Sequence, residues 1–544
     1  MTLHDNKIRC ADALLKILEK NNVKYIFGHP GEQILPFYDA LRTSSIRHVL
    51  MRHEQGAAHA ADGYARVSFS FGVCVATAGP GALNLVMGVA TAFKDSVPMI
   101  VITGDVSRDF KGKNVFQDVD VNGVFKPITL ESFHIESGED GISKLKHTIQ
   151  LIKHGKTGPV HLNFPKDVLE EMVNLRVPDI NEEYSHETSL NGSEDAVSLI
   201  ENSKRLLILA GAGIIWAHAV DELRDFAERN SIPVATTYSA RGVLPETHPL
   251  CLGMIGLRGT DASNFAGGNC DLLIAIGCRF SERTKIGVGK TKIIHVNPDQ
   301  DVLEGSINIQ GDACDFLNEI KDIKIKSMEK WLKELECHSK HHDIKTNYND
   351  IPVKPQRAIK EILDASGDAT TVGDAGTHTA WVNILKKITR PSELIFSGGF
   401  GPMGYGLPAA IGASLANPEK NVVLVAGDGG FQMTEQELAV IAREKMKILI
   451  CIINNSSLGI IKQWQDMYYR KRYEVELENP DFVKLAAAYG IKGERVTAPC
   501  EVYTAVKNAL NLKEPYLIDI MVDKEEGIVL PEISLSKIKD QPMR

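Results

Sequence analysis

The 544-residue sequence contains no run of apolar residues that is long enough to cross a bilayer. Its longest apolar stretch, around residues 206–217, is too short and too rich in glycine. The first twenty residues, MTLHDNKIRCADALLKILEK, resemble neither a secretory signal nor an Arg- and Ser-rich transit peptide. We therefore expect a cytoplasmic protein with no membrane partner.

The chain also lacks an excess of basic residues. The 61 Lys and Arg residues are outnumbered by 70 Asp and Glu residues, which gives a formal net charge of −9. No cluster of Lys and Arg interleaved with aromatic residues offsets this balance. Because proteins that bind nucleic acid normally carry such a basic surface, we expect no nucleic-acid partner.

The sequence lacks a C-x-x-C pair, and its nine cysteines are an odd number that cannot all pair within the chain. Several of them, such as Cys74 and Cys451, interrupt apolar runs, where cysteine behaves as a small hydrophobic residue. We interpret the cysteines as reduced core residues, and not as disulfides or a metal cluster.

What is present is the composition of an ordinary globular protein, with 43% apolar and 24% charged residues. The length suggests about three domains. Helical and strand patterns alternate along the chain, which is typical of α/β domains with parallel sheets flanked by helices. A polar stretch with proline, residues 173–190, indicates a linker. We predict domains at residues 1–175, 190–340 and 352–544.

The most informative stretch is a pair of apolar runs, residues 422–426 and 448–453, which enclose a glycine-rich turn and a helical pattern. This arrangement indicates strand, loop, helix, strand. Thr434 and Glu437 have the spacing of a capping box, which predicts where the helix begins. Strands joined by a helix lie parallel, so their carboxyl ends should reach the same sheet edge, where α/β folds bind ligands.

Two oxygen-bearing side chains follow these strands. Asp428 lies in the turn Gly427-Asp428-Gly429-Gly430 after the first strand, and Asn455 follows the second. A carboxylate and an amide oxygen beside backbone amides suit Mg²⁺ that holds a diphosphate, whereas zinc would require Cys or His. Taken alone, the pattern fits a surface loop with a turn-forming Asn pair equally well.

The spacing from Asp428 to Asn455, together with NNSSLGIIKQWQDMYY, resembles the thiamine-diphosphate motif of the acetohydroxyacid (acetolactate) synthase family. The resemblance implies that Asp428, Asn455 and the backbone carbonyl of Ser457 bind the metal ion. RHEQGA, ATAGPGALN and GPVHLNFPKDV resemble the pyrimidine-binding domain of the same family. The resemblance covers nearly the whole chain and implies three α/β domains, which bind the pyrimidine, a flavin and the diphosphate in that order.

Glu54 of RHEQGA receives its role from this resemblance, since the matching residue hydrogen-bonds N1′ of the aminopyrimidine. A carboxylic acid at N1′ drives the 4′-amino group towards its imino form, which then takes the proton from C2 of the thiazolium. Without the resemblance, a Glu in the first turn of a helix is most often a solvated residue. The family pattern also implies that Phe116, Gln117 and Lys166 lie near the substrate.

Further contacts are implied by the resemblance alone. For thiamine diphosphate they are Gly79, Asn84, Gly376, Thr377, His378, Met403, Gly427, Gly429 and Gly430, where Met403 is the residue on which the family bends the cofactor. LGMIGLRGTDASNF and RFSER resemble flavin-binding segments, which implies FAD contacts at Gly211, Gly259 and Arg279. Arg283 matches the residue that receives the acceptor's carboxylate, which a planar guanidinium binds in a bidentate manner.

The chain departs from the family pattern at several places. His29-Pro30-Gly31-Glu32-Gln33 stands where the family usually has Tyr-Pro-Gly-Gly-Ala, and a carboxylate at Glu32 would oppose an anionic substrate if it pointed inward. Asn297 stands where an acidic residue is expected, and Arg258 occupies a position that is His in many relatives. The C-terminal tail also differs from the Pro- and Met-rich tail of the family.

The resemblance predicts an acetolactate synthase, which decarboxylates pyruvate on thiamine diphosphate with Mg²⁺ and joins the two-carbon unit to a second 2-keto acid, in branched-chain amino acid biosynthesis. A paralogous 2-keto acid decarboxylase, or a carboligase with another substrate, is the alternative that His29 and Glu32 favour. A non-catalytic protein of the same fold is a second alternative, which the joint presence of Glu54, Asp428 and Asn455 opposes. In this superfamily the glutamate of one subunit meets the metal site of another, which implies a homodimer or dimer of dimers. A small regulatory subunit is a further partner that the family suggests.

Overall fold

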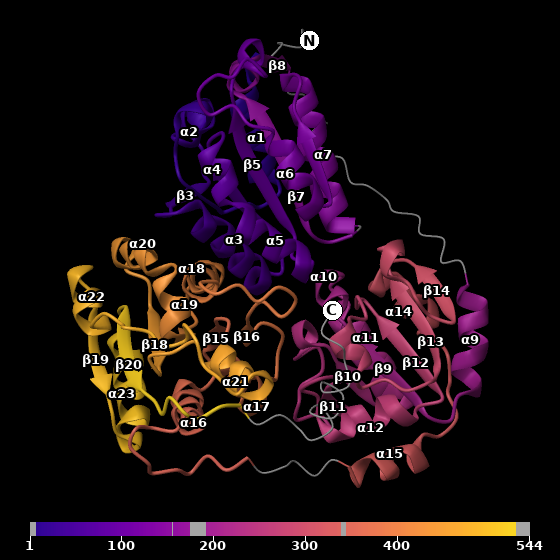
Figure 1. Cartoon of the computed structure of the whole chain (residues 1–544). Helices are drawn as coiled ribbons and strands as arrows, with labels where there is room; N and C mark the ends of the chain where they lie inside the picture. Colours follow the sequence, from indigo (N-terminus) through magenta and orange to yellow (C-terminus); the bar gives the residue numbers. More distant parts are fainter. Residues whose placement is uncertain (1–6, 155, 175–191, 339–343, 529–544) are drawn as a thin grey trace. The chain divides into compact units, whose positions relative to one another are not determined.

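The computed structural model describes residues 7–154, 156–174, 192–338 and 344–528. The chain forms two compact units, of which the first holds the N-terminal and C-terminal sheets and the second holds the central sheet (Figure 1). The first unit comprises Met1–Ser185, Tyr348–Thr379 and Ile395–Glu526, and the second comprises His186–Asn347, Ala380–Leu394 and Gly527–Arg544. The predicted α/β fold with three parallel sheets is confirmed, whereas the predicted domain limits stay a prediction.

The N-terminal sheet has six parallel strands in the order β3-β2-β4-β5-β7-β6. In chain order they are β2 (Tyr25–Gly28), β3 (Arg47–Leu50), β4 (Gly72–Ala76), β5 (Met99–Asp105), β6 (Glu131–His134) and β7 (Pro159–Pro165). β5 and β7 are buried along their whole length, as expected for strands covered by helices on both faces. Since parallel crossovers are right-handed, α2 (Leu35–Leu41) and α7 (Gly138–His154) lie on the opposite face from α3 (Glu54–Ser68) and α5 (Val86–Asp95).

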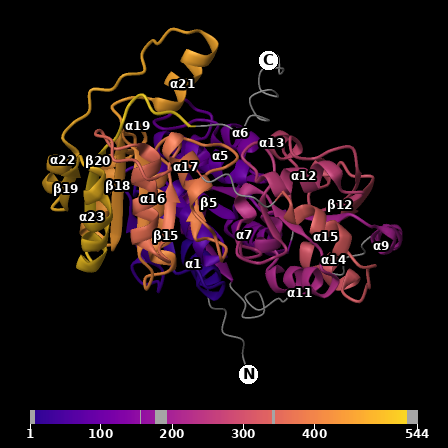
Figure 2. The same ribbon diagram turned by 90° about the horizontal axis from the view of Figure 1, so that it is seen from below.

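The C-terminal sheet has the order β16-β15-β17-β18-β20-β19. Its strands are β15 (Thr370–Gly373), β16 (Leu394–Ile395), β17 (Val422–Gly427), β18 (Ile448–Asn454), β19 (Lys492–Val496) and β20 (Tyr516–Met521). α16 (Pro355–Ser366) and α23 (Pro499–Leu512) pack side by side (Figures 1 and 2), and the handedness of the crossovers places α18 (Gly406–Ala416) on the other face. Three short helices also accompany this sheet: α19 (Asp428–Gln432), α20 (Leu438–Glu444) and α22 (Phe482–Ala488). The longer helix α21 (Gly459–Tyr468) follows β18.

The central sheet has six parallel strands in the order β11-β10-β9-β12-β13-β14. They are β9 (Leu206–Ala210), β10 (Val234–Thr236), β11 (Cys251–Met254), β12 (Leu272–Ile276), β13 (Lys292–Asn297) and β14 (Ile307–Gln310). The accompanying helices are α9 (Ser193–Asn202), α10 (Gly213–Trp216), α11 (Val220–Asn230), α12 (Asp261–Asn269), α13 (Glu282–Lys285), α14 (Ala313–Ile320) and α15 (Glu329–Glu336). The other elements are β1 (Lys7–Arg9), β8 (Met172–Asn174), α1 (Cys10–Lys20), α4 (Pro80–Asn84), α6 (Val121–Phe125), α8 (Lys166–Glu170) and α17 (Thr377–Leu385).

Helix α3 packs on α18, and small residues permit their close approach. A Cβ atom at Gly412 would overlap the carbonyl oxygen of Ala60, and a Cβ atom at Gly63 would overlap that of Ala409. The Ala-rich sequence of α3 therefore serves a helix–helix contact between the N-terminal and C-terminal sheets of the first unit. The same contact buries an ion pair, since Asp62 of α3 accepts hydrogen bonds from the Arg66 guanidinium (2.6 Å) and the Tyr405 hydroxyl (2.6 Å).

Two details correct the sequence predictions. Thr434 makes no side-chain capping bond, so the predicted capping box is wrong. Cys74 and Cys451 are buried as predicted, but Cys337 and Cys500 are exposed and are not core residues. Most of the predicted linker, residues 175–190, lies outside the described residues.

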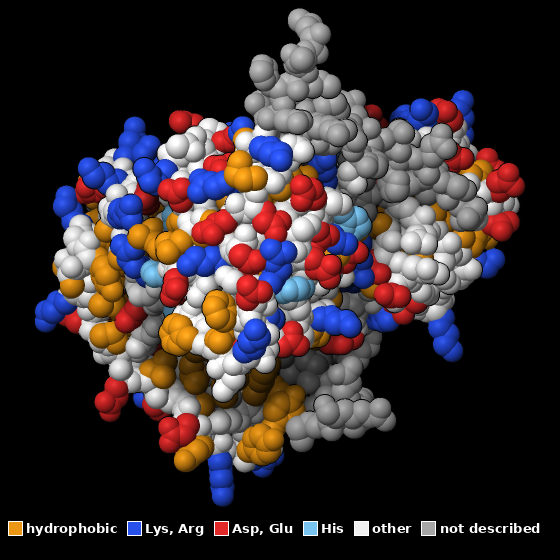
Figure 3. Space-filling view, turned by 90° about the horizontal axis from the view of Figure 1, so that it is seen from above, with side chains coloured by type: hydrophobic (Ala, Val, Ile, Leu, Met, Phe, Trp, Pro, Cys, Tyr) orange, Lys and Arg blue, Asp and Glu red, His pale blue; other side chains and the backbone are white. Residues whose placement is uncertain are grey.

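The described surface carries no continuous basic region on the face drawn in Figure 3, where Lys and Arg alternate with Asp and Glu. Among the described residues, no helix is long and apolar enough to cross a membrane.

Candidate active site

The strand–helix–strand unit predicted around Asp428 is present. β17 and β18 are parallel neighbours, with Gly427 paired to Ile453, so both carboxyl ends reach the same edge of the C-terminal sheet. Asp428 begins α19 directly after β17, and the Asn479 side-chain amide donates both to its carboxylate (2.7 Å) and to Oδ1 of Asn454 at the end of β18 (3.0 Å). The two loops that carry Asp428 and Asn455 are therefore bridged by Asn479.

Asp428 is only 2% exposed, and burial raises its pKa although Asn479 donates a hydrogen bond to it (2.7 Å). Among the described residues, the structure gives this carboxylate no cationic partner. Asn455 accepts from the Ser457 amide (3.1 Å), and the buried Ser457 hydroxyl has no hydrogen-bond partner. A buried, uncompensated carboxylate beside amide and carbonyl oxygens fits a hard divalent cation, whose charge would offset the desolvation.

The loop between β15 and α17, at the same edge of the C-terminal sheet, suits a diphosphate. His378 lies in the first turn of α17, is buried, and has an Nε2 atom without a hydrogen-bond partner. A Cβ atom at Gly376 would lie 2.6 Å from its ring, and one at Gly427 would lie 3.0 Å from it, so only glycine leaves the ring its place. Burial lowers the pKa of His378 to about 4, which keeps the imidazole neutral. The backbone N–H groups at the N-terminus of α17, beside this neutral ring, are suited to a phosphate oxygen.

Met403 is held close to the Asp428 turn. Its Cε atom would lie 3.2 Å from a Cβ at Gly429, so the thioether end rests against that glycine. The turn that carries Met403 is fixed by Asp374, which follows β15 and accepts hydrogen bonds from the amides of Gly404 (3.0 Å) and Gly406 (2.9 Å). Burial raises the pKa of Asp374 to about 6. The sequence interpretation missed Asp374, although its place directly after an apolar strand is the signal that identified Asp428.

A second cluster surrounds Glu54 in the N-terminal sheet. Glu54 is the first residue of α3 and is buried, in contrast to the solvated residue that this position usually holds. Its Oε2 atom accepts from the Asn84 side chain (2.9 Å), and a Cβ at Gly81 would lie 3.2 Å from Oε1. Gly79 adopts a positive φ of 53° immediately before α4. Three of the predicted contact residues therefore lie together.

Glu437 lies between β17 and β18 of the C-terminal sheet and contacts the start of α3, which belongs to the N-terminal sheet. Its carboxylate accepts from the backbone amides of Arg52 (3.1 Å) and His53 (3.1 Å), directly before Glu54. Burial raises the pKa of Glu437 to about 7, although these amides and the Arg52 charge act in the opposite direction. The residue expected to cap its own helix thus binds the N-terminus of a helix nearly four hundred residues earlier, and local spacing cannot reveal this partner.

The loop after β5 carries Phe116 and Gln117 to the Gly79 turn. Phe116 is 77% exposed, whereas the Oε1 atom of Gln117 is buried without a hydrogen-bond partner. Gln117 has a positive φ of 66°, and a Cβ at Gly79 would lie 2.6 Å from its carbonyl oxygen. Lys166 begins α8, and its Nζ lies 4.0 Å from Oε1 of Glu32. The Glu32 carboxylate that departs from the family pattern is thus exposed and faces a cation.

The predicted flavin residues lie in the second unit. Gly211 and Gly213 approach the backbone of Gly277 so closely that a Cβ at either would overlap it. Gly259 donates its amide to the Gly256 carbonyl (2.9 Å) in the turn after β11, and Arg283 accepts the Leu257 amide (3.0 Å) on its carbonyl in the same region.

Arg279 precedes α13, and Arg283 lies within it. Burial raises the pKa of Tyr238, and the positive charges of Arg258 and Arg283 partly offset this rise. The Tyr238 hydroxyl therefore lies within electrostatic range of both guanidinium groups. Asn297 is buried at the end of β13 and accepts from the Asp299 amide (2.9 Å), so it closes its own loop.

The structure thus gathers the predicted residues of the first unit into two clusters, one around Asp428 and one around Glu54. Among the described residues, no hydrogen bond or ion pair joins Glu54 to Asp428. The catalytic and binding roles of these residues stay predictions.

Comparison with known families gives three consecutive matches. Residues 8–124 match the N-terminal TPP binding domain of thiamine pyrophosphate enzymes, residues 193–320 match their central domain, and residues 374–520 match their C-terminal TPP binding domain. Individual relatives cover nearly the whole chain. The probable acetolactate synthase large subunit of Methanocaldococcus jannaschii is 41% identical over 98% of this chain and 95% of its own. The acetolactate synthase large subunit of Lactococcus lactis is 37% identical over 97% and 95%, and the isozyme 2 large subunit of Escherichia coli is 35% identical over 95% and 96%.

Proposed function

Since the chain belongs to the thiamine-diphosphate-dependent acetolactate synthase family, we propose that it joins a two-carbon unit from pyruvate to a second 2-keto acid. The family match identifies a thiamine-diphosphate-dependent enzyme. The observation that carries the proposal is the buried Asp428 carboxylate, which lies beside Asn455 at a sheet edge and lacks a cationic partner within the described residues.

Mg²⁺ would be held by Asp428, Asn455 and the Ser457 carbonyl. The diphosphate would be held at the loop of His378 and by the backbone of Thr377, Gly429 and Gly430, and Met403 would support the cofactor's bend. When bound, thiamine diphosphate supplies the carbanion that adds to a 2-keto group and accepts the electrons released with CO₂. The residues of the chain orient the cofactor, exclude water from it and exchange protons with it.

Glu54 holds the proton that this chemistry needs at N1′ of the pyrimidine. The Asn84 amide occupies Oε2, which leaves Oε1 on the side of Gly81 for the ring nitrogen. Burial keeps this carboxyl group away from water, which a general acid of this kind requires.

The substrate carboxylates meet cationic and amide groups in the same proposal. Arg283 would bind the carboxylate of the acceptor 2-keto acid, and Gln117 and Lys166 would line the entrance on the Glu54 side. The 4.0 Å separation of Lys166 from Glu32 supports this, because a neighbouring cation weakens the repulsion that Glu32 would exert on an anionic substrate.

Further parts of the proposal rest on the family. FAD would contact Gly211, Gly259 and Arg279 in a central domain at about residues 190–340. The family implies a homodimer or dimer of dimers, in which Glu54 of one subunit would meet Asp428 of another. Because the relatives are named large subunits, a small regulatory subunit is also proposed.

Product analysis tests the function. Purified protein is incubated with thiamine diphosphate, Mg²⁺, FAD and pyruvate, with a Glu54→Gln variant as the control. The proposal requires acetolactate from the wild type and its loss in the variant. Acetaldehyde as the sole product would identify a decarboxylase instead, and cofactor binding without pyruvate turnover would indicate another 2-keto acid.

A further inference from the structure

A lysine closes the loop that carries Phe116 and Gln117. Lys111 lies near the start of this loop, and its Nζ donates to both carboxylate oxygens of Asp105 (3.1 and 2.8 Å) and to the Val119 carbonyl (3.2 Å). The same Nζ lies 3.1 Å from Asp118, on the other side of the Phe116–Gln117 pair. One ammonium group therefore holds both ends of the loop.

Asp118 completes this closure from the opposite end. Its Oδ2 atom accepts the Gly112 amide (2.8 Å), next to Lys111 in the sequence. Burial lowers the pKa of Lys111, but its hydrogen bonds to Asp105 and Asp118 outweigh that effect and the pKa is raised. Burial likewise raises the pKa of Asp118, and the Lys111 and Gly112 bonds lower it further than burial raises it. The loop closure is therefore ionic.

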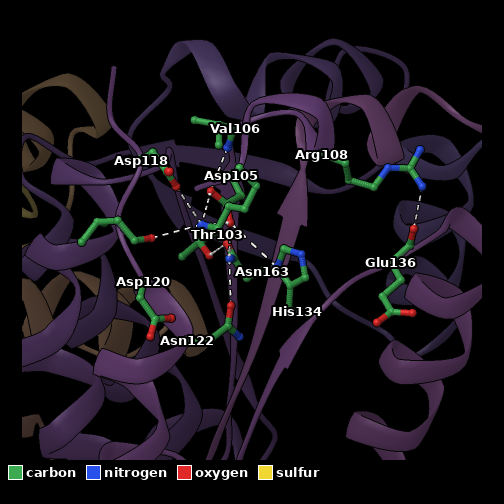
Figure 4. Close-up of polar contacts among 12 residues, drawn as sticks. Thr103, Asp105, Val106, Arg108, Asp118, Asp120, Asn122, His134, Glu136 and Asn163 are labelled. Atoms are coloured by element: carbon green, nitrogen blue, oxygen red, sulfur yellow. Dashed lines mark hydrogen bonds and ion pairs between the residues drawn. The ribbon is translucent and has the colours of Figure 1, made fainter. Parts of the chain in front are cut away.

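We call the Lys111 ammonium group together with the Asp105 and Asp118 carboxylates the clamp. It is anchored in the sheet by Asp105, the last residue of β5, which is fully buried. Asp105 also accepts a hydrogen bond from the side-chain amide of Asn163 on β7 (2.7 Å). The same amide group donates to Oδ1 of Asn122 (3.0 Å), and Oδ1 of Asn163 accepts from the Thr103 hydroxyl (2.7 Å). Figure 4 shows these side chains converging at the strand ends, below Asp118. His134 adds a ring nitrogen 3.9 Å from Asp105. Since Thr103, Asp105 and Asn163 are fully buried, they give the loop a fixed reference to the neighbouring strands β5 and β7.

Between the two clamped ends, the backbone takes the conformation that brings Gln117 to the Gly79 turn. The positive φ of Gln117 is costly for any residue other than glycine, and it persists only where the surrounding structure enforces it. Its carbonyl lies against Gly79, close to the Glu54 cluster. Any change in the loop closure therefore moves the Phe116–Gln117 pair relative to that cluster.

We propose that Lys111, clamped between Asp105 and Asp118, is a positioning residue that fixes Phe116 and Gln117 for binding of the 2-keto acid. This inference rests on the proposed function of the same site. Lys111 acts through the loop and touches no reacting atom, so its loss weakens substrate binding more than it slows the chemical step.

The test compares three single variants of the full-length protein. Lys111→Met removes the charge and keeps the length, whereas Lys111→Arg keeps the charge. Lys113→Met is the matched control, because Lys113 is exposed in the same loop and the described structure gives it no ion pair. We expect Lys111→Met to raise KM for pyruvate about tenfold with kcat changed less than about threefold. Lys111→Arg should recover most of this effect, and Lys113→Met should match the wild type.

A second measurement does not depend on turnover. Hydrogen exchange of peptides that span residues 107–121 should become faster in Lys111→Met, including the Gly112 amide that Asp118 accepts. Peptides of the buried strand β4 (Gly72–Ala76) should keep the wild-type exchange in the same variant. This result separates loss of loop position from loss of folding.

The proposal is overturned if Lys111→Met has the KM and the loop exchange of Lys113→Met. It is also overturned if Lys111→Met lowers kcat alone. A wild type that does not turn over pyruvate would contradict the proposed function, while the exchange comparison would still decide whether the clamp exists.

Discussion

Replacement of Glu437 by Gln should change how stability depends on pH. The two carboxylate oxygens of Glu437 each accept one backbone amide at the start of α3. A Gln side chain has only one accepting oxygen, so one amide would face a donor. Loss of such a buried bond costs about 1–3 kcal/mol at every pH.

The wild type carries an opposite, pH-dependent cost. Burial raises the pKa of Glu437 from 4.5 in the unfolded chain to about 7 in the folded protein. Below 4.5 both states are protonated, and between these values only the unfolded state releases its proton, so folding stability falls as the pH rises. At 1.36 kcal/mol per pKa unit, the loss above pH 7 amounts to about 3 kcal/mol. The Gln variant does not titrate and avoids this loss.

The assay is the thermal midpoint of wild type and Glu437→Gln at pH 5 and pH 8, with the exposed Glu419→Gln as control. The variant should be less stable at pH 5. Because part of the loss in the wild type has already occurred at pH 5, about 2.5 kcal/mol remains between pH 5 and pH 8, so the difference should shrink or reverse by about 5 °C, at about 2 °C per kcal/mol for a chain of this size. A difference that stays constant between the two pH values would refute the raised pKa and the reasoning from it.

Three further changes have defined outcomes. Asp428→Asn should abolish the increase in Tm that thiamine diphosphate and Mg²⁺ give the wild type, where a hundredfold excess over Kd stabilises the folded state by about 2.7 kcal/mol; an unchanged increase would place the cation elsewhere. Gly412→Ala should lower the stability by at least about 1–3 kcal/mol, because its Cβ would overlap the Ala60 carbonyl, and a wild-type Tm would argue against the α3–α18 contact. Asn84→Ala should lower kcat about tenfold or more with little change in Tm, since it removes the donor to Glu54, and steady-state kinetics with an unaltered kcat would show that Asn84 does not orient that residue.

The sequence foretold the elements that depend on local pattern. The apolar runs of β17 and β18 and the glycine turn between them indicated parallel strands, and the structure has them in register. The Ala-rich sequence of α3 is typical of a helix that packs closely against another, and the Gly412 contact has this form. Periodicity and turn chemistry decide such features within a few residues.

Features that depend on partners distant in the chain were missed or misjudged. Glu437 had the spacing for a local capping box, but amides of another sheet compete for its carboxylate and win. Asp374 gains its position from the amide of Gly404, which lies 30 residues later in the sequence and which only the folded chain brings near. Such competition between local and distant donors cannot be read from spacing, because its outcome is set by tertiary packing.

The most direct measurement concerns the site built from two clusters. Glu54→Gln and Asp428→Asn are each expected to be inactive alone. Co-expressed with different affinity tags and purified through both, they form mixed dimers in which one of the two sites combines an intact Glu54 from one subunit with an intact Asp428 from the other. Acetolactate formation at about half of the wild-type rate per dimer is the predicted result, whereas mixed dimers as inactive as either parent would contradict a site shared between subunits.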